Sequence, residues 1–307
     1  TTLKKIKMKK ILITGATGMV GKKLYSALKE RGYTAHCVVR KKQNIFEHEF
    51  VWDYENDYLE EGALQGIHSI IHLAGATISK RWTTSYKKEI ISSRVDSALF
   101  LEKKVKEKNI KLQSFISASG INYYGDWNDE KAATENDEPQ KKDFLTEVCR
   151  LWEDSANRFE AVSERIVKLR ISPVISAHGG FLEPLKKLTD LHLASPVGSG
   201  KQYFPWIHVD DLVGMLVFAL ENENMNGPFN ACADEVPTNA QLMKTLAKSM
   251  DKNYIPMAVP SIVLKFTLGE MSEMILNGVN ASNQKIKSKG FIFKYNELDD
   301  ALKNVIN

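Results

Sequence analysis

A glycine-rich turn between an apolar run and an amphipathic stretch constrains this chain more than any other feature. The run at residues 10–14 reads Lys-Ile-Leu-Ile-Thr, and Gly15, Gly18 and Gly21 follow at three-residue steps. Residues 19–31 then show apolar positions at helical spacing, and Gly32 stands where a helix would end. Residues 33–40, Tyr-Thr-Ala-His-Cys-Val-Val-Arg, then have the character of a second strand. The sequence therefore predicts a strand, a tight turn, a helix and a second strand.

The spacing of the three glycines is typical of a dinucleotide-binding turn. Gly15 permits the tight turn, Gly18 lets backbone N–H groups approach a diphosphate, and Gly21 lets the helix pack close to the sheet. The positive end of the helix then faces the phosphates. A chance glycine-rich turn is the alternative, and the flanking strands and helix argue against it. The residues predicted to bind the cofactor at this turn are Gly15, Thr17, Gly18, Met19, Val20 and Gly21.

The end of the second strand indicates which dinucleotide is preferred. The chain reads Val39-Arg40-Lys41-Lys42 there. An acidic residue at this point accepts a hydrogen bond from the ribose 2′-hydroxyl of NAD, whereas an arginine accommodates the 2′-phosphate of NADP. Val39 and Arg40 therefore predict NADP(H) as the cofactor. A solvated basic loop is the alternative.

The remaining chain alternates strands and helices up to about residue 172. Strands are predicted over residues 49–53, 69–73, 114–117 and 166–171, with helices over 82–106 and 144–162. This alternation is typical of an α/β fold with a doubly wound parallel sheet, the Rossmann architecture. Residues 1–172 are predicted to form the NADP(H)-binding domain, with residues 1–7 as a tail. Residues 173–307 are predicted to form mainly a smaller substrate-capping region, with helices over 211–221 and 239–250 and some segments that return to the first domain.

Composition and charge exclude several other classes of protein. The formal net charge is +4, and Lys4, Lys5 and Lys7 account for three of these charges, so the body of the chain is nearly neutral. No basic patch is interleaved with aromatic residues, so we expect no nucleic-acid partner. No stretch reaches the ~18 apolar residues of a membrane span and no secretion signal is visible, so we expect no membrane contact and a cytoplasmic protein.

Two groups of metal-ligating residue types do not indicate a metal site. The three cysteines are far apart and form no Cys-x-x-Cys pair, so neither a disulfide framework nor a zinc site is predicted. His208, Asp210 and Asp211 lie close together, but on a loop that enters a helix. We expect Asp210 or Asp211 to cap that helix and His208 to be hydrogen-bonded at the joint between the two regions.

Further segments carry a family resemblance. With the glycine-rich turn, the segments His72-Leu-Ala-Gly75-Ala, Ser117-Ala-Ser119 and Trp206-Ile-His-Val-Asp-Asp211 resemble the extended short-chain dehydrogenase/reductase superfamily over nearly the whole chain. More narrowly, the chain resembles the SDR39U1-like subfamily of NAD(P)-dependent epimerase/dehydratase proteins. The segments that carry this likeness include Arg81-Trp82-Thr83, Ser93-Arg94-Val95, Tyr123-Tyr124-Gly125, Trp152-Glu153, Gly198-Ser-Gly200 and Phe204-Pro-Trp-Ile-His208.

The resemblance implies further cofactor contacts. The segment at the end of the strand near residue 72 is implied to line the cofactor, and Val174 to touch its nicotinamide half. Glu89 is implied to border the cofactor, and Arg94, where relatives in the wider superfamily carry Asn, to reach an anion of cofactor or substrate. An ordinary buried strand end and plain helix-surface charges are the alternatives. The residues of the strand-end segment are His72, Leu73, Ala74 and Gly75.

The usual catalytic pair of this superfamily is missing. The resemblance implies a Tyr and, four residues later, a Lys that lowers the pKa of the Tyr. Aligned on Glu153, those positions hold Leu145 and Cys149. Ser119 and Tyr124 then remain as candidate catalytic groups, although both hydroxyls would equally anchor a loop, and Lys80 and Arg81 stay open as alternatives.

These sequence features are consistent with two functions. The first is an NADP(H)-dependent oxidoreductase or epimerase that acts on an unidentified small molecule. The second is a catalytically silent NADPH-binding sensor or regulator.

Overall fold

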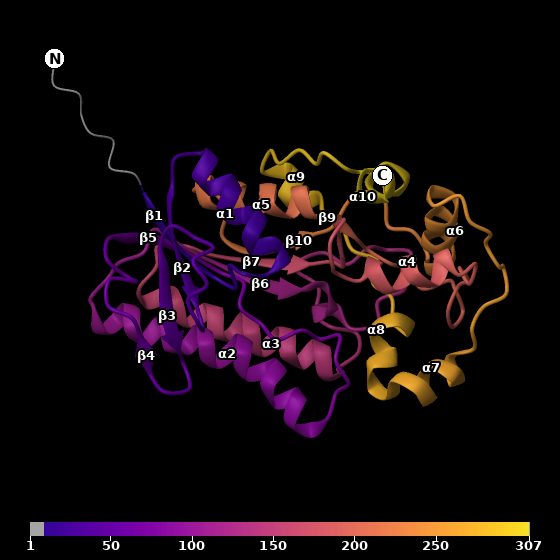
Figure 1. The fold of residues 1–307 in the computed structure, drawn as a ribbon, viewed down its shortest axis with the longest axis horizontal. Helices are drawn as coiled ribbons and strands as arrows, with labels where there is room; N and C mark the ends of the chain where they lie inside the picture. The colour runs from indigo at the N-terminus through magenta and orange to yellow at the C-terminus, as the bar shows by residue number, and fades with distance from the viewer. Residues whose placement is uncertain (1–8, 307) are drawn as a thin grey trace, which may run out of the picture.

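A mostly parallel eight-stranded sheet forms the centre of the molecule in this computed structural model, which describes residues 9–306 (Figure 1). The expected tail at residues 1–7 lies outside the described residues. The sheet order is β10-β7-β6-β5-β1-β2-β3-β4, and β4 alone pairs antiparallel. The strands are β1 (Lys10–Thr14), β2 (Thr34–Val39), β3 (Glu49–Asp53), β4 (Tyr58–Leu59), β5 (Ile67–His72), β6 (Ser114–Gly120), β7 (Ile166–Ile171) and β10 (Gly227–Ala231). The predicted doubly wound α/β fold is confirmed.

The strand order places a binding crevice at one point of the sheet. The chain runs from β1 outward to β2, β3 and β4, and then returns to add β5 on the other side of β1. Ligands of open α/β sheets bind where the strand order reverses, outside the carboxyl ends of the strands. The crevice therefore lies at the carboxyl ends of β1 and β5, where the glycine-rich turn follows β1.

Helices cover both faces of the sheet because each central strand is apolar on both sides. Ile11 and Ile13 pack in the core beneath α1 (Met19–Glu30) and α5 (Val209–Glu221), whereas Leu12 between them packs toward α2 (Thr84–Glu107) and α3 (Phe144–Asn157). The two pairs of helices lie above and below the sheet in Figure 1. The 3₁₀ turns η1 (Ile121–Tyr124) and η2 (Arg158–Ala161) follow β6 and α3.

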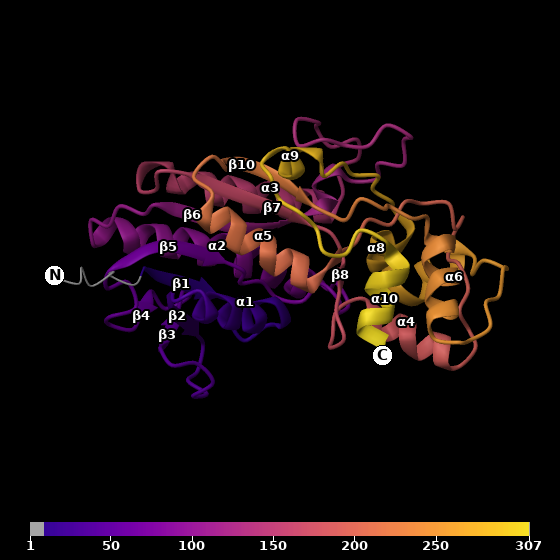
Figure 2. The same ribbon diagram turned by 90° about the horizontal axis from the view of Figure 1, so that it is seen from above.

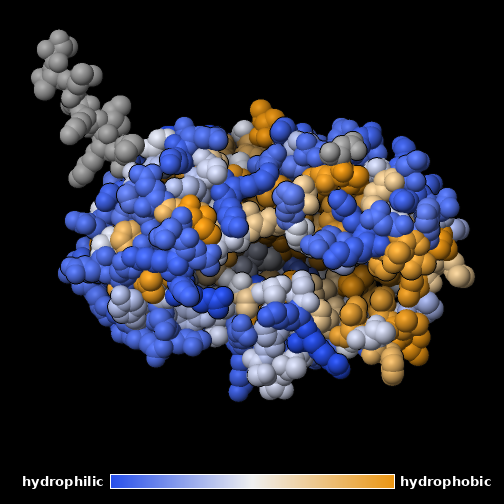
Figure 3. Space-filling model, viewed as in Figure 1, coloured by the Kyte–Doolittle hydropathy of each residue, from blue (hydrophilic) through white to orange (hydrophobic). Residues whose placement is uncertain are grey.

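The C-terminal region sits beyond the carboxyl ends of the strands (Figure 2). Its core gathers around Trp206, which is fully buried. The helix α7 buries none of its side chains, and Ile262 and Phe266 are exposed. Figure 3 shows a hydrophobic area at the right, where Figure 1 places α7 in the same view. The elements are β8 (Val174–Ile175), α4 (Leu182–Asp190), β9 (Ile207–His208), α6 (Asn239–Ser249), α7 (Ser261–Leu268), η3 (Gly269–Ser272), α8 (Glu273–Leu276), α9 (Gln284–Ser288) and α10 (Leu298–Ile306).

Two segments after residue 172 belong to the sheet domain, one as a covering helix and one as a strand. The helix α5 contributes Leu212 and Leu216 to the core above the sheet, and β10 pairs with β7 along its whole length. The sequence did not predict β10, because it begins with Gly227-Pro228, a pair that normally interrupts a strand. The strand forms at the edge of the sheet, where a proline without an N–H group is tolerated.

The start of α5 differs from the expectation. His208, not Asp210 or Asp211, is the N-cap: its Nδ1 accepts a hydrogen bond from the backbone N–H of Asp210 at 3.2 Å. The carboxylate of Asp211 instead accepts from the backbone N–H groups of Lys294 and Tyr295, at 2.7 and 2.9 Å. This aspartate therefore fastens the C-terminal segment to the sheet domain. Among the described residues, no helix is long and apolar enough to cross a membrane.

Candidate functional site

The glycine-rich turn adopts a conformation that its glycines make possible for different reasons. Gly15 has a φ of +67°, and a Cβ there would lie 2.7 Å from the carbonyl oxygen of Leu73. A Cβ on Gly21 would collide with the Gly15 carbonyl and the backbone of Ala16. Gly18 has an ordinary extended backbone, and a Cβ there would meet only the Gly15 oxygen, at 3.2 Å. The protein itself thus excludes side chains at Gly15 and Gly21, whereas the space beside Gly18 is open toward the cavity.

The helix that follows the turn begins without a side-chain cap. Among the five longest helices in residues 9–306, α2, α3, α5 and α6 have a capping side chain that accepts a backbone N–H, and α1 has none. Its first turn also contains no acidic residue. The first N–H groups of a helix have no partner within the helix. Gly18, the N-cap of α1, lines the same cavity, so the start of this helix suits an anion there.

The turn forms one wall of a cavity of about 450 Å³ at the carboxyl ends of the parallel strands. Figure 3 shows this face of the molecule hollowed near its centre. Nine of the residues predicted to bind the cofactor line this cavity: Gly15, Thr17, Gly18, Val39, Arg40, Leu73, Ala74, Gly75 and Glu89. The loop and strand ends that the sequence placed at one edge therefore come together around one space.

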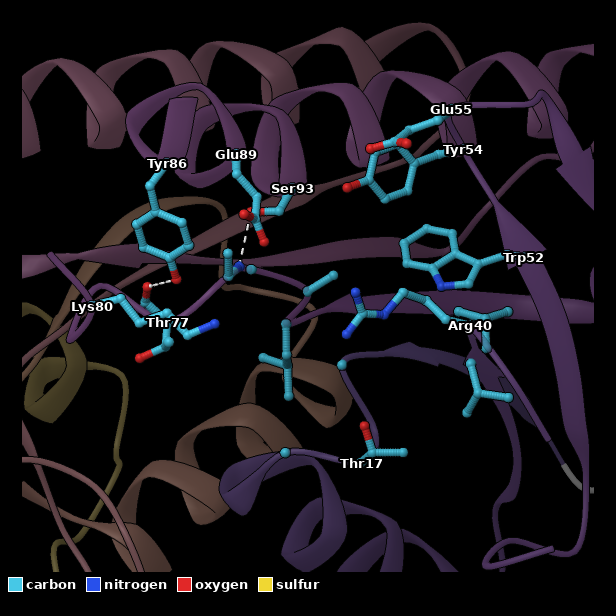
Figure 4. A pocket seen from close by; sticks show the side chains of 18 residues that line it. Thr17, Arg40, Trp52, Tyr54, Glu55, Thr77, Lys80, Tyr86, Glu89 and Ser93 are labelled. Carbon is cyan, nitrogen blue, oxygen red and sulfur yellow. Dashed lines mark hydrogen bonds between the residues drawn. The ribbon is translucent and has the colours of Figure 1, made fainter. Parts of the chain in front are cut away.

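The far end of the cavity is built by the ends of β2 and β3. Arg40 and Trp52 lie beside each other there, next to Tyr54 (Figure 4). Arg40 is exposed and forms no ion pair within the described part of the chain, whereas Lys42, two residues later, pairs with Glu60 at 2.5 Å. Arg40 is the basic residue of this run that lines the cavity, and its guanidinium is therefore available to an anion.

Sequence reasoning missed part of this end. Trp52, Tyr54 and Glu55 line the cavity but were not predicted. The signal was present, because β3 is parallel to β1 and its carboxyl end must lie at the same edge of the sheet. Thr77, Lys80, Tyr86 and Ser93 on the opposite wall were also missed as cofactor-site residues.

Six of the residues predicted to bind the cofactor do not line this cavity: Met19, Val20, Gly21, His72, Arg94 and Val174. His72 is fully buried, and its Nδ1 lies 2.9 Å from the Thr14 hydroxyl, which in turn accepts from the backbone N–H groups of Leu73 and Ala74. Burial lowers the pKa of His72 to about 4. The imidazole is therefore neutral at pH 7 and joins β5 to β1 behind the cavity wall.

Arg94 supports the cavity wall from behind. Its guanidinium is 9% exposed and donates to the carbonyls of Ala76 and Ile90, at 3.0 and 2.9 Å. The ring of Trp152 lies 4.9 Å from it, and a Cβ on Gly75 would lie 2.9 Å from its central carbon. The glycine therefore packs directly on the guanidinium plane. The expectation that Arg94 reaches an anion does not match this geometry, because its charge is turned to backbone carbonyls beneath the loop.

The candidate catalytic hydroxyls belong to a buried polar network. Tyr124 is 0% exposed; its hydroxyl donates to Asn230 at 2.8 Å and accepts from Arg170 at 2.9 Å. Ser119 is also buried and donates to Glu153 at 3.0 Å. Glu153 in turn forms a bidentate pair with Arg170. Neither hydroxyl lines the cavity, and burial raises the pKa of Tyr124.

The positions of the missing catalytic pair are buried on α3. Leu145 packs in an apolar cluster with Trp82 and Ile90, and Cys149 lies beside Gly120 at the end of β6. Burial, reinforced by the nearby charge of Glu153, raises the pKa of the Cys149 thiol to about 12. The thiol is therefore protonated at neutral pH and does not replace the lysine as a charged group.

Comparison with known proteins agrees with this fold. The model of the NAD dependent epimerase/dehydratase family matches residues 11–232, and a domain of unknown function, DUF1731, matches residues 259–305. Epimerase family proteins of Staphylococcus aureus and Staphylococcus epidermidis are 34% and 35% identical over 303 residues, which cover 97% of this chain and 99% of each relative.

Two solved structures have a similar shape. The human epimerase family protein SDR39U1, solved with NADPH, has a TM-score of 0.87 and 27% identity, with 96% of this chain and 98% of that chain covered. The UDP-N-acetylglucosamine 4-epimerase of Bacillus cereus has a TM-score of 0.76 and 17% identity, with 97% and 98% covered, and so supports the fold alone.

Proposed function

The chain belongs to the NAD dependent epimerase/dehydratase family, and from this premise we propose that it binds NADPH in the cavity at the carboxyl ends of β1, β2 and β5. The observation that carries the proposal is the pairing of an uncapped helix N-terminus at one side of the cavity with the free Arg40 at its far end. The first suits a diphosphate, and the second suits a 2′-phosphate. The presence of NADPH in human SDR39U1 supports the same cofactor.

The residues that line the cavity suit the separate parts of this cofactor. The turn at Gly18 leaves room for phosphate oxygens, and Leu73, Ala74 and Gly75 form a narrow wall opposite Thr17. Trp52 is mostly buried but lines the cavity next to Arg40, where the edge of its indole suits contact with a purine base. NADPH, when bound, supplies a hydride to an electrophilic carbon of a small molecule. The chain orients it with backbone N–H groups and fixes its adenosine end.

Titration calorimetry with NADPH and NADH tests the choice of cofactor. We expect NADPH to bind more tightly, because a charge-assisted pair with Arg40 contributes ~1.5 to 3 kcal/mol. Arg40→Ala should remove most of that difference and leave NADH binding nearly unchanged. The neighbouring Lys42→Ala is the matched control, since Lys42 is paired with Glu60. Equal affinities in the wild type, or a preference that survives Arg40→Ala, would refute the assignment.

We propose that the reaction is hydride transfer to or from an unidentified small molecule. Ser119 and Tyr124 remain the predicted hydroxyl groups, and their burial means that they act on a substrate only through the network with Glu153 and Arg170. Tyr124→Phe and Ser119→Ala should then lower turnover without changing NADPH affinity. Consumption of bound NADPH in a pooled-metabolite screen is the measurement that identifies a substrate.

A specific observation favours a second candidate, a silent NADPH-binding regulator. The hydroxyls of Tyr124 and Ser119 have protein partners, and Leu145 and Cys149 occupy the positions of the usual proton-transfer pair. The two candidates differ in one measurement. A regulator keeps NADPH bound without oxidation in every metabolite pool, whereas an enzyme oxidises it in at least one.

A further inference from the structure

The loop between β5 and α2 places a lysine on the cavity wall that faces the glycine-rich turn. Thr77 and Lys80 line the same cavity as Gly15 and Gly18. Figure 4 shows the Lys80 side chain below Tyr86, on the side of the cavity across from Arg40 and to the left of Thr17. Lys80 forms no ion pair with any residue between 9 and 306. A cation at the cavity is therefore available to a ligand.

Side chains of α2 and of Trp82, just before it, hold the backbone of this loop. The Trp82 indole donates to the Ile78 carbonyl at 2.9 Å, and the Tyr86 hydroxyl donates to the Thr77 carbonyl. The Ser93 hydroxyl accepts from the backbone N–H of Ala76 at 2.8 Å. The backbone of residues 76–78, just before Lys80, is thus held in place. Less conformational entropy is lost on binding when the groups that contact a ligand are already positioned.

Three positively charged groups lie at different points around the cavity. Arg40 lies at the far end beside Trp52, and the helix N-terminus lies at the turn. Lys80 comes from the opposite wall, where its ammonium rests 5.5 Å from the centre of the Tyr86 ring. An exposed contact of this kind is weak, so it does not hold the ammonium away from an anion. The flexible stem of lysine lets the charge reach over the cavity.

We propose that Lys80 binds the diphosphate of the cofactor from the side opposite the glycine-rich turn. This inference rests on the proposed function, because it takes NADPH as the ligand of the cavity. The diphosphate then lies between the N–H groups at the start of α1 and the Lys80 ammonium. Thr77 adds a hydroxyl on the same wall.

Lys80 and Arg40 should affect the affinities of different ligands. NADPH and NADH share the diphosphate, so Lys80 increases the affinity of both by the same factor. Arg40 increases the affinity of NADPH alone, since NADH lacks the 2′-phosphate. The two effects separate further with fragments: ADP carries the diphosphate without the 2′-phosphate, and 2′-AMP carries the 2′-phosphate without the diphosphate.

Calorimetry of the full chain with these four ligands tests the inference. Lys80→Met should weaken NADPH, NADH and ADP by about tenfold, the scale of one charge-assisted contact. It should change the affinity for 2′-AMP by less than about twofold. Arg40→Ala should give the reverse pattern, with 2′-AMP weakened and ADP unchanged. Arg81→Met is the control, because Arg81 is exposed and adjacent but does not line the cavity.

Each contrary result has its own meaning. If Lys80→Met leaves all four affinities unchanged, or weakens them only as much as Arg81→Met does, Lys80 does not bind the diphosphate, and the proposed function stands. If Lys80→Met weakens only NADPH and 2′-AMP, Lys80 reads the 2′-phosphate instead and the inference is wrong. If the wild type binds none of the four ligands, the proposed function fails, and the inference fails with it.

Discussion

The three glycines of the turn, Gly15, Gly18 and Gly21, are needed for different structural reasons. Gly15 and Gly21 are restricted by the protein, since a Cβ at either would meet backbone atoms of Leu73, Gly15 or Ala16. Gly18 has a backbone conformation that any residue adopts, and the space beside it opens into the cavity. Gly15 and Gly21 are therefore required for folding, whereas Gly18 is required for ligand binding.

This difference predicts separate effects of two substitutions. Gly18→Val should fold with nearly wild-type stability and lose NADPH binding, because its side chain fills the space of the diphosphate. Gly21→Val should lower the melting temperature strongly, because its Cβ collides with the Gly15 carbonyl. Thermal unfolding by circular dichroism and calorimetry with NADPH measure both. A folded Gly18→Val variant that binds NADPH normally would show that the turn is not the phosphate site.

His72 makes the stability of the fold depend on pH. Burial lowers its pKa to about 4 in the folded chain, whereas the unfolded value is near 6.5. Its contribution is therefore fully present above pH 6.5 and is lost as the pH falls from 6.5 toward 4. The corresponding loss is roughly 3 kcal/mol, from the difference between the two pKa values. Denaturant unfolding at pH 7, 6 and 5 measures it.

Two histidine variants separate this effect from general acid destabilisation. His72→Gln should reduce the steepness of the stability decrease between pH 6.5 and 5. His192→Asn is the control, because His192 is exposed and its positive φ of 59° suits asparagine. If both variants keep the wild-type slope, His72 is not the group that titrates.

At the scale of elements, the loop between β5 and α2 depends on one buried arginine. Arg94 donates to the carbonyl of Ala76 at the start of the loop and supports Gly75 by direct packing. Its charge is compensated by carbonyl groups and by the face of Trp152 rather than by a carboxylate. The helix α2 thus positions the cavity wall from behind, and the ligand meets only the loop.

Arg94→Lys should loosen this loop while the rest of the sheet stays intact. A lysine keeps the charge but lacks the planar group that reaches two carbonyls and fills the space under Gly75. We expect faster amide hydrogen exchange in residues 75–82 and weaker binding of NADPH and NADH by a similar factor. Arg150→Lys on the exposed side of α3 should change neither. Unchanged exchange in residues 75–82 would contradict a supporting role for Arg94.

At the scale of the whole molecule, the sheet is completed by segments from both halves of the chain. The strand β10 pairs with β7, and α5 covers Val167 and Leu169 from above. Asp211 then fastens the C-terminal segment at Lys294 and Tyr295. The proposed boundary at residue 172 therefore divides regions of the sequence but cuts through one hydrophobic core.

We predict that a fragment of residues 9–172 does not fold by itself. It lacks β10 and α5, so the β7 edge and a large apolar face of the sheet would be exposed to water. The fragment should aggregate or show no cooperative unfolding in circular dichroism, whereas residues 9–306 should unfold cooperatively. A soluble fragment with a cooperative transition would show that the first 172 residues are an independent domain.

The sequence by itself determined the features that depend on neighbouring residues. The glycine spacing after β1 predicted the turn, and the alternation of apolar strands and helices predicted the doubly wound sheet, because periodicity and turn chemistry are local properties. The position of Val39 and Arg40 at the end of β2 likewise predicted that they bind the cofactor, and both line the cavity. These predictions needed no knowledge of contacts between distant segments.

Only the tertiary structure decided which side chains reach the cavity and which support it from behind. Trp52 and Lys80 line the site although no motif marks them, whereas His72 and Arg94, which the family resemblance implied, turn to buried partners. The hydroxyl of Tyr124 likewise meets Asn230, 106 residues away in the chain. Such contacts depend on how strands and helices pack across the sheet. A pattern along the chain does not determine the direction in which a side chain points in the packed structure.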